Sequence, residues 1–294
     1  MFTQCYLFEI TRPLEITGDE LDKKLKEFSF SPCTAQQKIK SGWASPVKVS
    51  SDMLVLQIQD LWIINLRKQE KIIPPTEVKD RLEEKISALE AEHGRKVSRK
   101  EKAQLKEDVI TLLTPQALSR TTDLLAVILP SKNLMMVNTA SASKAEEVAS
   151  SLRKAIGTMP VVPVQTEVSP STLMTNWLNK TEDLPENITL GYEVFLKSDD
   201  EDGGSMKLTG MDIADEFALN YLNNGMTPMS IELNWKEKIQ FSIDDKLAFK
   251  KIKLSDTYKE YIHDELGEAD AINQFVGSTM MVTDEIERIF SALK

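Results

Sequence analysis

The sequence has few of the residues from which metal sites and most catalytic sites are built. It contains two cysteines, Cys5 and Cys33, and two histidines, His93 and His263. Two cysteines provide neither a disulfide framework nor a zinc quartet, and single histidines on separate expected helices are typical of exposed positions. The sequence also has no phosphate-binding glycine loop, nucleophile elbow or zinc-protease motif. We therefore expect no metal and no cofactor, and an enzyme is possible but is supported by no motif.

Long hydrophobic runs are also missing. The longest purely apolar run, Leu124 to Leu129, is far shorter than the ~20 residues of a membrane-spanning helix. The first residues do not read as a secretory signal, because Glu9 interrupts the first apolar run and no cationic segment precedes it. Apolar residues make up 41% of the chain and are spread along it, which excludes disorder as its main state. We expect a cytoplasmic globular protein that does not enter a membrane.

The charge is unevenly divided between the two halves of the chain. The 294 residues carry a net charge of -10, which by itself argues against nucleic acid as a partner. Residues 1–154 hold 24 basic and 21 acidic side chains, a net of +3, whereas residues 155–294 hold 12 and 25, a net of -13. The acidity therefore belongs to the C-terminal half, and the placement of the charges is more informative than their sum.

The pattern of apolar residues predicts strands and helices in separate blocks. Expected strands are residues 5–10, 53–58, 61–66, 124–129, 134–137, 161–164, 230–235, 239–243 and 247–254. Expected helices follow the capping box at Thr17–Glu20 and cover residues 145–156, 258–266 and 284–293. Blocks of this kind, without regular βαβ units, favour the α+β class with mixed antiparallel sheets.

The clearest elements are two consecutive helices in the centre of the chain. Apolar residues recur at helical spacing from Val78 to Leu89, and a second capping box, Ser98–Glu101, begins a helix that ends at Pro115. The short turn between them predicts a protruding antiparallel helical hairpin. We accordingly divide the chain into four regions. They are a central α+β part (residues 1–74), the hairpin or tip region (75–120), a return to the central part (121–165) and an acidic α+β base (166–294).

An acidic loop at residues 199–204 invites comparison with a calcium site, but its spacing does not fit one. With Gly203 at the sixth loop position, the first and twelfth positions are Ser198 and Thr209, which lack the expected carboxylates. A solvated acidic turn is the simpler interpretation. A metal-dependent nuclease is an alternative for which the sequence identifies no further ligands and no positioned base. Its carboxylates would be Asp199, Asp200 and Asp202.

Two basic groups stand out against the overall acidity. The tip group surrounds the turn between the central helices and comprises Arg95, Lys96, Arg99, Lys100 and Lys102. The strand-end group comprises Arg67, Lys68 and Lys71. Because the helix dipole disfavours cations in a first turn, the tip group indicates an external anion such as phosphate. The alternative is a solvated face paired with Glu84, Glu90 and Glu92. The sequence has no base-reading signature, so DNA contact is expected through the backbone.

Several stretches of the sequence closely resemble the RdgC family of recombination-associated proteins. The most specific lie between residues 67 and 120, and others follow in family order along nearly the whole chain. The central stretches are residues 67–74 (RKQEKIIP), 82–92 (LEEKISALEAE), 100–102 and 105–108. The others are Phe30–Cys33, Gly42–Trp43, Ala117–Arg120, Leu152–Lys154, Pro160–Pro163, Glu201–Gly204 and Ile239–Phe241.

The resemblance implies a non-enzymatic protein of the nucleoid that binds DNA without sequence preference. It implies a head-to-head homodimer that closes as a ring around duplex DNA, binds double- and single-stranded DNA, and restrains recombination by RecA. The DNA-binding residues then correspond to the tip group, the strand-end group, Arg120 and Lys207. Leu118 takes the place of an aromatic residue at the gate between protomers, where it offers less apolar area.

A second class of function remains open. The acidic C-terminal half is also compatible with a protein-interaction module that acts on a recombination or replication protein, with DNA binding secondary. The two hypotheses differ in whether a protein partner is retained after an extract has been treated with nuclease.

Overall fold

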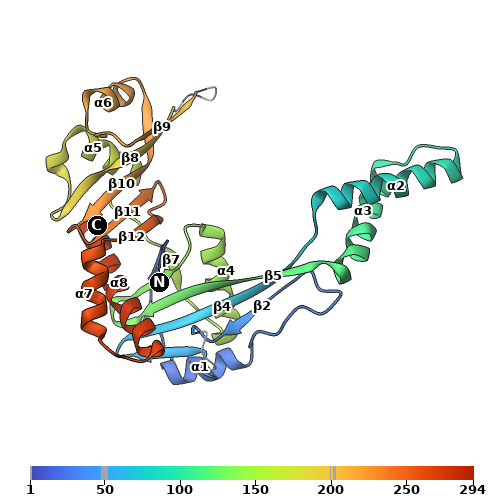
Figure 1. Ribbon diagram of the computed structural model, residues 1–294, viewed down its shortest axis with the longest axis horizontal. Helices are drawn as coiled ribbons and strands as arrows, with labels where there is room; N and C mark the ends of the chain where they lie inside the picture. The colour runs from blue at the N-terminus through green and yellow to red at the C-terminus, as the bar shows by residue number, and fades with distance from the viewer. Residues whose placement is uncertain (1, 48–51, 199, 201–202) are drawn as a thin grey trace.

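The structure is a computed structural model that describes residues 2–47, 52–198, 200 and 203–294. It contains two antiparallel sheets and several helices, so the predicted α+β class is confirmed. The sheets and most helices form a body at one end of an elongated molecule, and two helices lie at the other end (Figure 1). Of the expected acidic loop, Asp199, Glu201 and Asp202 lie outside the described residues.

The first sheet is built from strands of the N-terminal half. Their order is β2-β4-β5-β6-β1-β7, and β3 also pairs with β4. The strands are β1 (Tyr6–Ile10), β2 (Ile39–Ala44), β3 (Val55–Ile58), β4 (Leu61–Ile72), β5 (Leu118–Leu129), β6 (Leu134–Val137) and β7 (Val161–Pro163). On one face, Trp62 and Ile64 share a core with helices α1 (Gly18–Lys26) and α4 (Ala142–Ile156). On the other face, Ile63 and Val127 share a core with the C-terminal half.

The second sheet and four helices form what we call the C-terminal unit. The strand order is β12-β11-β10-β8-β9. The elements are α5 (Pro170–Asn179), β8 (Ile188–Ser198), β9 (Ser205–Thr209), α6 (Glu216–Asn223), β10 (Met226–Trp235), β11 (Ile239–Asp244), β12 (Phe249–Leu254), α7 (Asp256–Leu266) and α8 (Ala271–Leu293), with a short 3-10 turn at η3 (Thr181–Asp183). One face buries Ile231 and Phe241 in a core with Trp177 and Ile286. Alternation along β8 and β9 places polar side chains on the opposite face.

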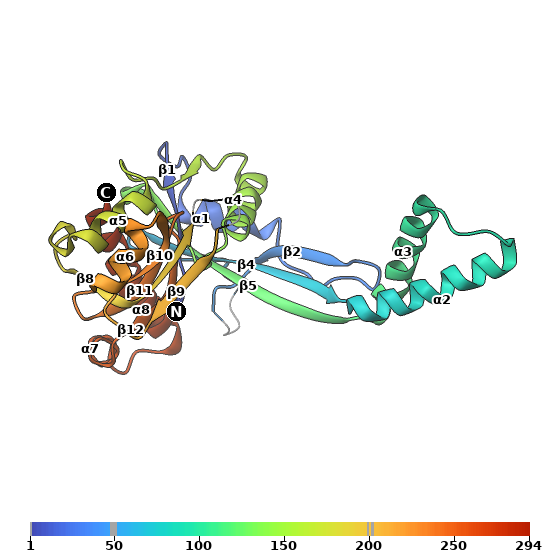
Figure 2. The same ribbon diagram turned by 90° about the horizontal axis from the view of Figure 1, so that it is seen from above.

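β4 and β5 continue well beyond the body of the first sheet. They pair without interruption from Trp62–Ile128 to Ile72–Leu118. Their outer halves are half-buried or exposed, and β2 pairs with the outer half of β4. We call this three-stranded extension the ribbon (residues 39–42, 67–72 and 118–123). Figures 1 and 2 show that it carries the next two helices away from the body.

These helices, α2 (Pro75–His93) and α3 (Arg99–Leu113), form what we call the arm (residues 75–113). α2 begins at Pro75, because a proline ring suits the first helical turn, and it ends at Gly94, whose φ of 61° is left-handed. α3 begins with the predicted capping box of Ser98 and Glu101. The helices contact each other, and a 3-10 turn, η1 (Thr114–Gln116), leads into β5. Their alignment as an antiparallel hairpin stays a prediction.

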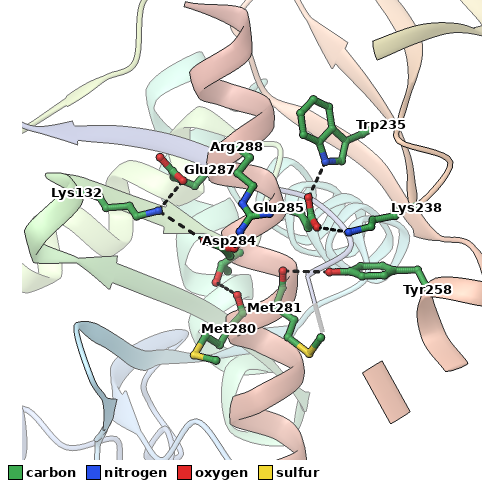
Figure 3. A network of polar contacts seen from close by, with 11 residues as sticks. Lys132, Trp235, Lys238, Tyr258, Met280, Met281, Asp284, Glu285, Glu287 and Arg288 are labelled. Carbon is green, nitrogen blue, oxygen red and sulfur yellow. Dashed lines mark hydrogen bonds and ion pairs between the residues drawn. The ribbon is translucent and has the colours of Figure 1, made fainter. Parts of the chain in front are cut away.

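The C-terminal helix α8 is tied to both halves of the chain by polar contacts (Figure 3). The buried Glu285 accepts hydrogen bonds from Trp235 Nε1 and Lys238 Nζ, each at 2.7 Å. Burial opposes ionisation of Glu285, but these two donors outweigh it and its pKa is lowered. On the other side of α8, Lys132 of the 3-10 turn η2 (Pro130–Lys132) lies 2.6 Å from Glu287. The helix therefore joins the C-terminal unit to the first sheet.

Most expected elements are confirmed, and several are longer than predicted. The final helix begins at Ala271 instead of residue 284, and the strand expected at 124–129 begins at Leu118. The pattern missed β2, α5, β8, β9 and α6. β8 was missed because its pairing with β10 shifts register near Gly191, which interrupts the alternation of apolar and polar residues.

Candidate nucleic-acid interface

The structure places the tip group on the outer part of the arm. Arg95 and Lys96 lie in the link between α2 and α3, and Arg99, Lys100 and Lys102 lie in the first turn of α3. All five side chains are exposed. The left-handed Gly94 and the Ser98 cap set the direction of the chain on either side of the link.

One cation of the tip group is already held by an acidic side chain. Arg95 donates two hydrogen bonds to Glu101, at 2.6 and 3.0 Å, and the same carboxylate accepts the Ser98 backbone N–H at 2.9 Å. The Arg95 hydrogen bonds, and then those of Ser98, hold the pKa of Glu101 well below its ordinary value. Arg95 therefore stabilises the link itself.

The other four cations of the tip group are available to an external ligand. Within the part of the chain that the structure describes, Lys96, Arg99, Lys100 and Lys102 form no ion pair with an acidic side chain. The alternative pairing with Glu84, Glu90 and Glu92 is not formed by these four cations. Glu84 pairs with Arg81 instead, and Glu90 accepts the Val97 backbone N–H. An exposed cation without a carboxylate partner can displace the counterions condensed on a phosphate without first breaking an internal pair.

A groove on the arm extends this basic surface. Its apolar floor comes from both helices and includes Val78, Leu82 and Ile110, and its volume is about 600 Å³. Four cations line it: Lys79, Arg99, Lys102 and Lys106. Lys106 was missed by the sequence analysis, although its spacing from Arg99 and Lys102 places all three on one helical face.

The strand-end group differs from the tip group, because most of its cations form ion pairs with acidic side chains of the same chain. Arg67 contacts both carboxylate oxygens of Asp123, at 2.7 and 3.1 Å, and this hydrogen bonding raises the pKa of its guanidinium. Lys68 lies 2.8 Å from Glu147 of α4. Arg120 lies 2.8 Å from Glu70, and Lys71 donates to the Ala117 carbonyl at 3.2 Å. These ribbon cations are therefore weaker phosphate ligands than the free cations of the arm.

The ribbon cations also do not form a single patch. Glu70 lies directly opposite Arg120, and Lys68 lies two residues before Glu70, so Lys68 and Arg120 share one face of the ribbon. Arg67 and Lys71 belong to the other face. A single DNA duplex could not lie against all four side chains at once.

Leu118 is the most exposed large apolar side chain of the described residues, at 80%. It lies directly opposite Ile72, which is 48% exposed, and Ile39 on the neighbouring strand is 58% exposed. The three residues share one face of the ribbon, next to the arm. Leu118 is thus not a core residue, and an exposed apolar cluster at this place is typical of a contact surface.

The remaining predicted cation, Lys207, lies on β9 of the C-terminal unit, far from the arm (Figures 1 and 2). Its amino group is 3.2 Å from Glu193 of β8. Glu193 also pairs with Lys251 of β12, a contact that the sequence analysis missed because the two residues are distant in the chain.

The described residues do not assemble a metal site. Among them, no group of three or more His, Cys, Asp and Glu side chains has the arrangement to hold an ion, and both histidines are exposed. None of the helices described here combines the length and the apolar character that a transmembrane segment requires.

Comparison with known proteins identifies a family over the full length. A family model described as "Putative exonuclease, RdgC" matches residues 1–294. The chain is 36% identical over 292 residues to "Recombination-associated protein RdgC" of Aeromonas hydrophila, covering 99% of this chain and 96% of that protein. It is 34% identical over 297 residues to the protein of the same name from Pseudomonas aeruginosa, and 33% identical over 293 residues to that from Yersinia enterocolitica, with the same coverage.

Proposed function

The chain belongs to the RdgC family, and from this premise we propose that it binds the DNA backbone without reading sequence, as a homodimer that closes around the duplex. The observation that carries the proposal is the set of four exposed arm cations without internal ion pairs: Lys96, Arg99, Lys100 and Lys102. Cations of this kind displace condensed counterions from DNA, which favours binding to any sequence. The chain acts by occupying DNA in the cytoplasm, at the nucleoid.

Closure of the ring rests on the ribbon and the arm. Leu118 is 80% exposed and pairs with Ile72, and the next residue, Ile73, lines the arm groove together with Val78 and Leu82. In a two-fold symmetric dimer, Leu118 of each protomer enters the groove of the other, so that both contacts form together. Burying this side chain contributes about 1.5–3 kcal/mol per contact, enough for a gate that opens reversibly.

Occupation of the duplex supplies the proposed biological effect. A ring on duplex DNA leaves only by sliding off an end or by opening its gate, and while it remains a RecA filament cannot exchange strands with the covered segment. The same four arm cations also bind single-stranded DNA, because single-stranded and double-stranded DNA both carry backbone phosphates.

A salt titration tests the electrostatic mechanism. The dissociation constant for duplexes of unrelated sequence should rise steeply and equally with salt, with a slope of about 0.9 in log–log form for each phosphate contacted. A response that is flat in salt, or that differs strongly between sequences, would remove backbone contact as the basis of binding.

The description of the matching family model, "Putative exonuclease, RdgC", makes nuclease activity the second candidate function. Incubation of end-labelled duplex with the protein and Mg²⁺ distinguishes it. Binding without loss of label supports a non-enzymatic role, whereas progressive shortening from an end would establish nuclease activity.

A further inference from the structure

The polar face of the second sheet contains an ion cluster that spans almost the whole sheet. Glu193 lies on β8, and its two carboxylate oxygens contact Lys207 of β9 at 3.2 Å and Lys251 of β12 at 2.5 Å. β12 is the edge strand at the far side, so Lys251 reaches over β11 and β10 to meet Glu193. The backbone of Lys251 has a left-handed φ of 52°, next to a register shift between β11 and β12.

Both lysines of this cluster remain accessible to solvent. The side chains of Lys207 and Lys251 are 51% and 49% exposed, whereas that of Glu193 is 20% exposed. The hydrogen bond from Lys251 is the main cause of a lowered pKa at Glu193, so this carboxylate stays ionised. Two outward-facing cations are thus held by one half-buried anion.

The strand that carries Lys207 lies on the side of the C-terminal unit that faces the arm. β9 lies on the side of the C-terminal unit nearer to the arm in both views (Figures 1 and 2). Lys197 of β8 lies two residues beyond Phe195, the partner of Lys207, and alternation puts it on the same face. A phosphate that approached this face would meet Lys207 and Lys251 only in competition with Glu193.

We infer that Glu193 is an internal competitor of the DNA backbone, which lowers affinity at the C-terminal unit by holding Lys207 and Lys251. The inference rests on the proposed function, because it concerns how tightly the same DNA is bound. Exposed ion pairs are weak, so holding two lysines in such pairs reduces affinity about two- to thirtyfold. The consequence is a protein that holds DNA less firmly than its lysine content allows and leaves it sooner.

The test compares Glu193→Gln with Glu260→Gln in duplex binding over a range of salt concentrations. Glu260 is an exposed residue of α7, and its replacement changes the net charge equally. Glu193→Gln should bind duplex about two- to thirtyfold more tightly at low salt than Glu260→Gln, with a steeper dependence on salt. Adding Lys207→Ala and Lys251→Ala to Glu193→Gln should abolish this difference.

The outcomes separate three interpretations. If the wild type and all variants fail to bind DNA, the proposed function is wrong. If the wild type binds and Glu193→Gln matches Glu260→Gln, or binds more weakly, the cluster only supports the sheet and the inference is overturned. A gain in affinity that persists without Lys207 and Lys251 also overturns it, because the gain then does not depend on released lysines. Thermal denaturation of each variant shows that the sheet is intact.

Discussion

At the residue scale, the cations differ mainly in whether a carboxylate already holds them. Arg67, Lys68, Arg95, Arg120 and Lys207 each lie within ion-pair distance of an acidic side chain. Among the described residues, the other four cations of the tip group, Lys96, Arg99, Lys100 and Lys102, have no such partner. Sequence spacing could identify the tip group as a cluster, but the carboxylates that hold the ribbon cations come from other strands and from α4. Only the tertiary structure brings those charges together.

Replacing Arg99 and Lys100 with Ala should weaken duplex binding to all sequences and reduce the log–log salt slope by up to about 2. Both residues lie in the first turn of α3, where cations are disfavoured, so the variant should be no less stable than the wild type. Fluorescence anisotropy with two unrelated duplexes measures the change. Lys23→Ala with Lys24→Ala on α1 is the matched control, and an equal loss in both variants would indicate a general charge effect.

The pKa of Glu101 provides a second prediction at this scale. Replacing Arg95 with Gln should raise the Glu101 pKa toward its ordinary value of 4.5, because the main donor to the carboxylate is lost. Since the folded pKa is depressed, the contribution of Glu101 to the link is present above 4.5 and disappears as pH falls through the folded pKa. NMR titration of the carboxyl carbon measures both proteins. A Glu101 pKa that is the same in both would refute the role of Arg95.

At the scale of the elements, predictability follows from how each segment is stabilised. α3 was predicted because Ser98, Glu101 and its apolar spacing are local signals. The outer half of β5 was not, because its residues Leu118 to Asp123 are exposed and lack alternation. These residues are extended because β4 supplies their hydrogen bonds, and that pairing is not a local property. The exposed ribbon was thus the part of the candidate site least accessible to prediction.

The anchoring of α8 makes a prediction about stability. Replacing Glu285 with Gln should lower the free energy of unfolding by about 1–2 kcal/mol, because Lys238 loses its ionised partner while Trp235 keeps an acceptor. Chemical denaturation followed by tryptophan fluorescence measures the change. Glu260→Gln, at an exposed position, should change stability by less than about 0.5 kcal/mol. Equal stabilities of the two variants would show that the Glu285 contacts contribute nothing net.

At the scale of the whole molecule, ring closure predicts a dependence on the topology of the DNA. The wild type should be retained on covalently closed circular DNA through a high-salt wash and lost from the same DNA after linearisation. Leu118→Ser should be lost from both, although its thermal stability should be unchanged because Leu118 is 80% exposed. Val168→Ser, at another exposed apolar position on the body, should behave as the wild type. Equal loss of wild-type protein from circles and linear DNA would argue against encirclement.

The ribbon finally gives the molecule a mechanical property. It has exposed side chains on both faces, so it resists bending chiefly through its ladder of backbone hydrogen bonds. The ribbon and α2 together extend about 50 Å from the body. The ribbon contributes six residue pairs at about 3.3 Å each, and the 19 residues of α2 contribute about 1.5 Å each. A flexure of about 10° at the root of the ribbon displaces the far end of α2 by about 8 Å while both cores stay intact. Under the proposed function, this elastic motion of the strands lets the tip group follow an irregular or bent duplex.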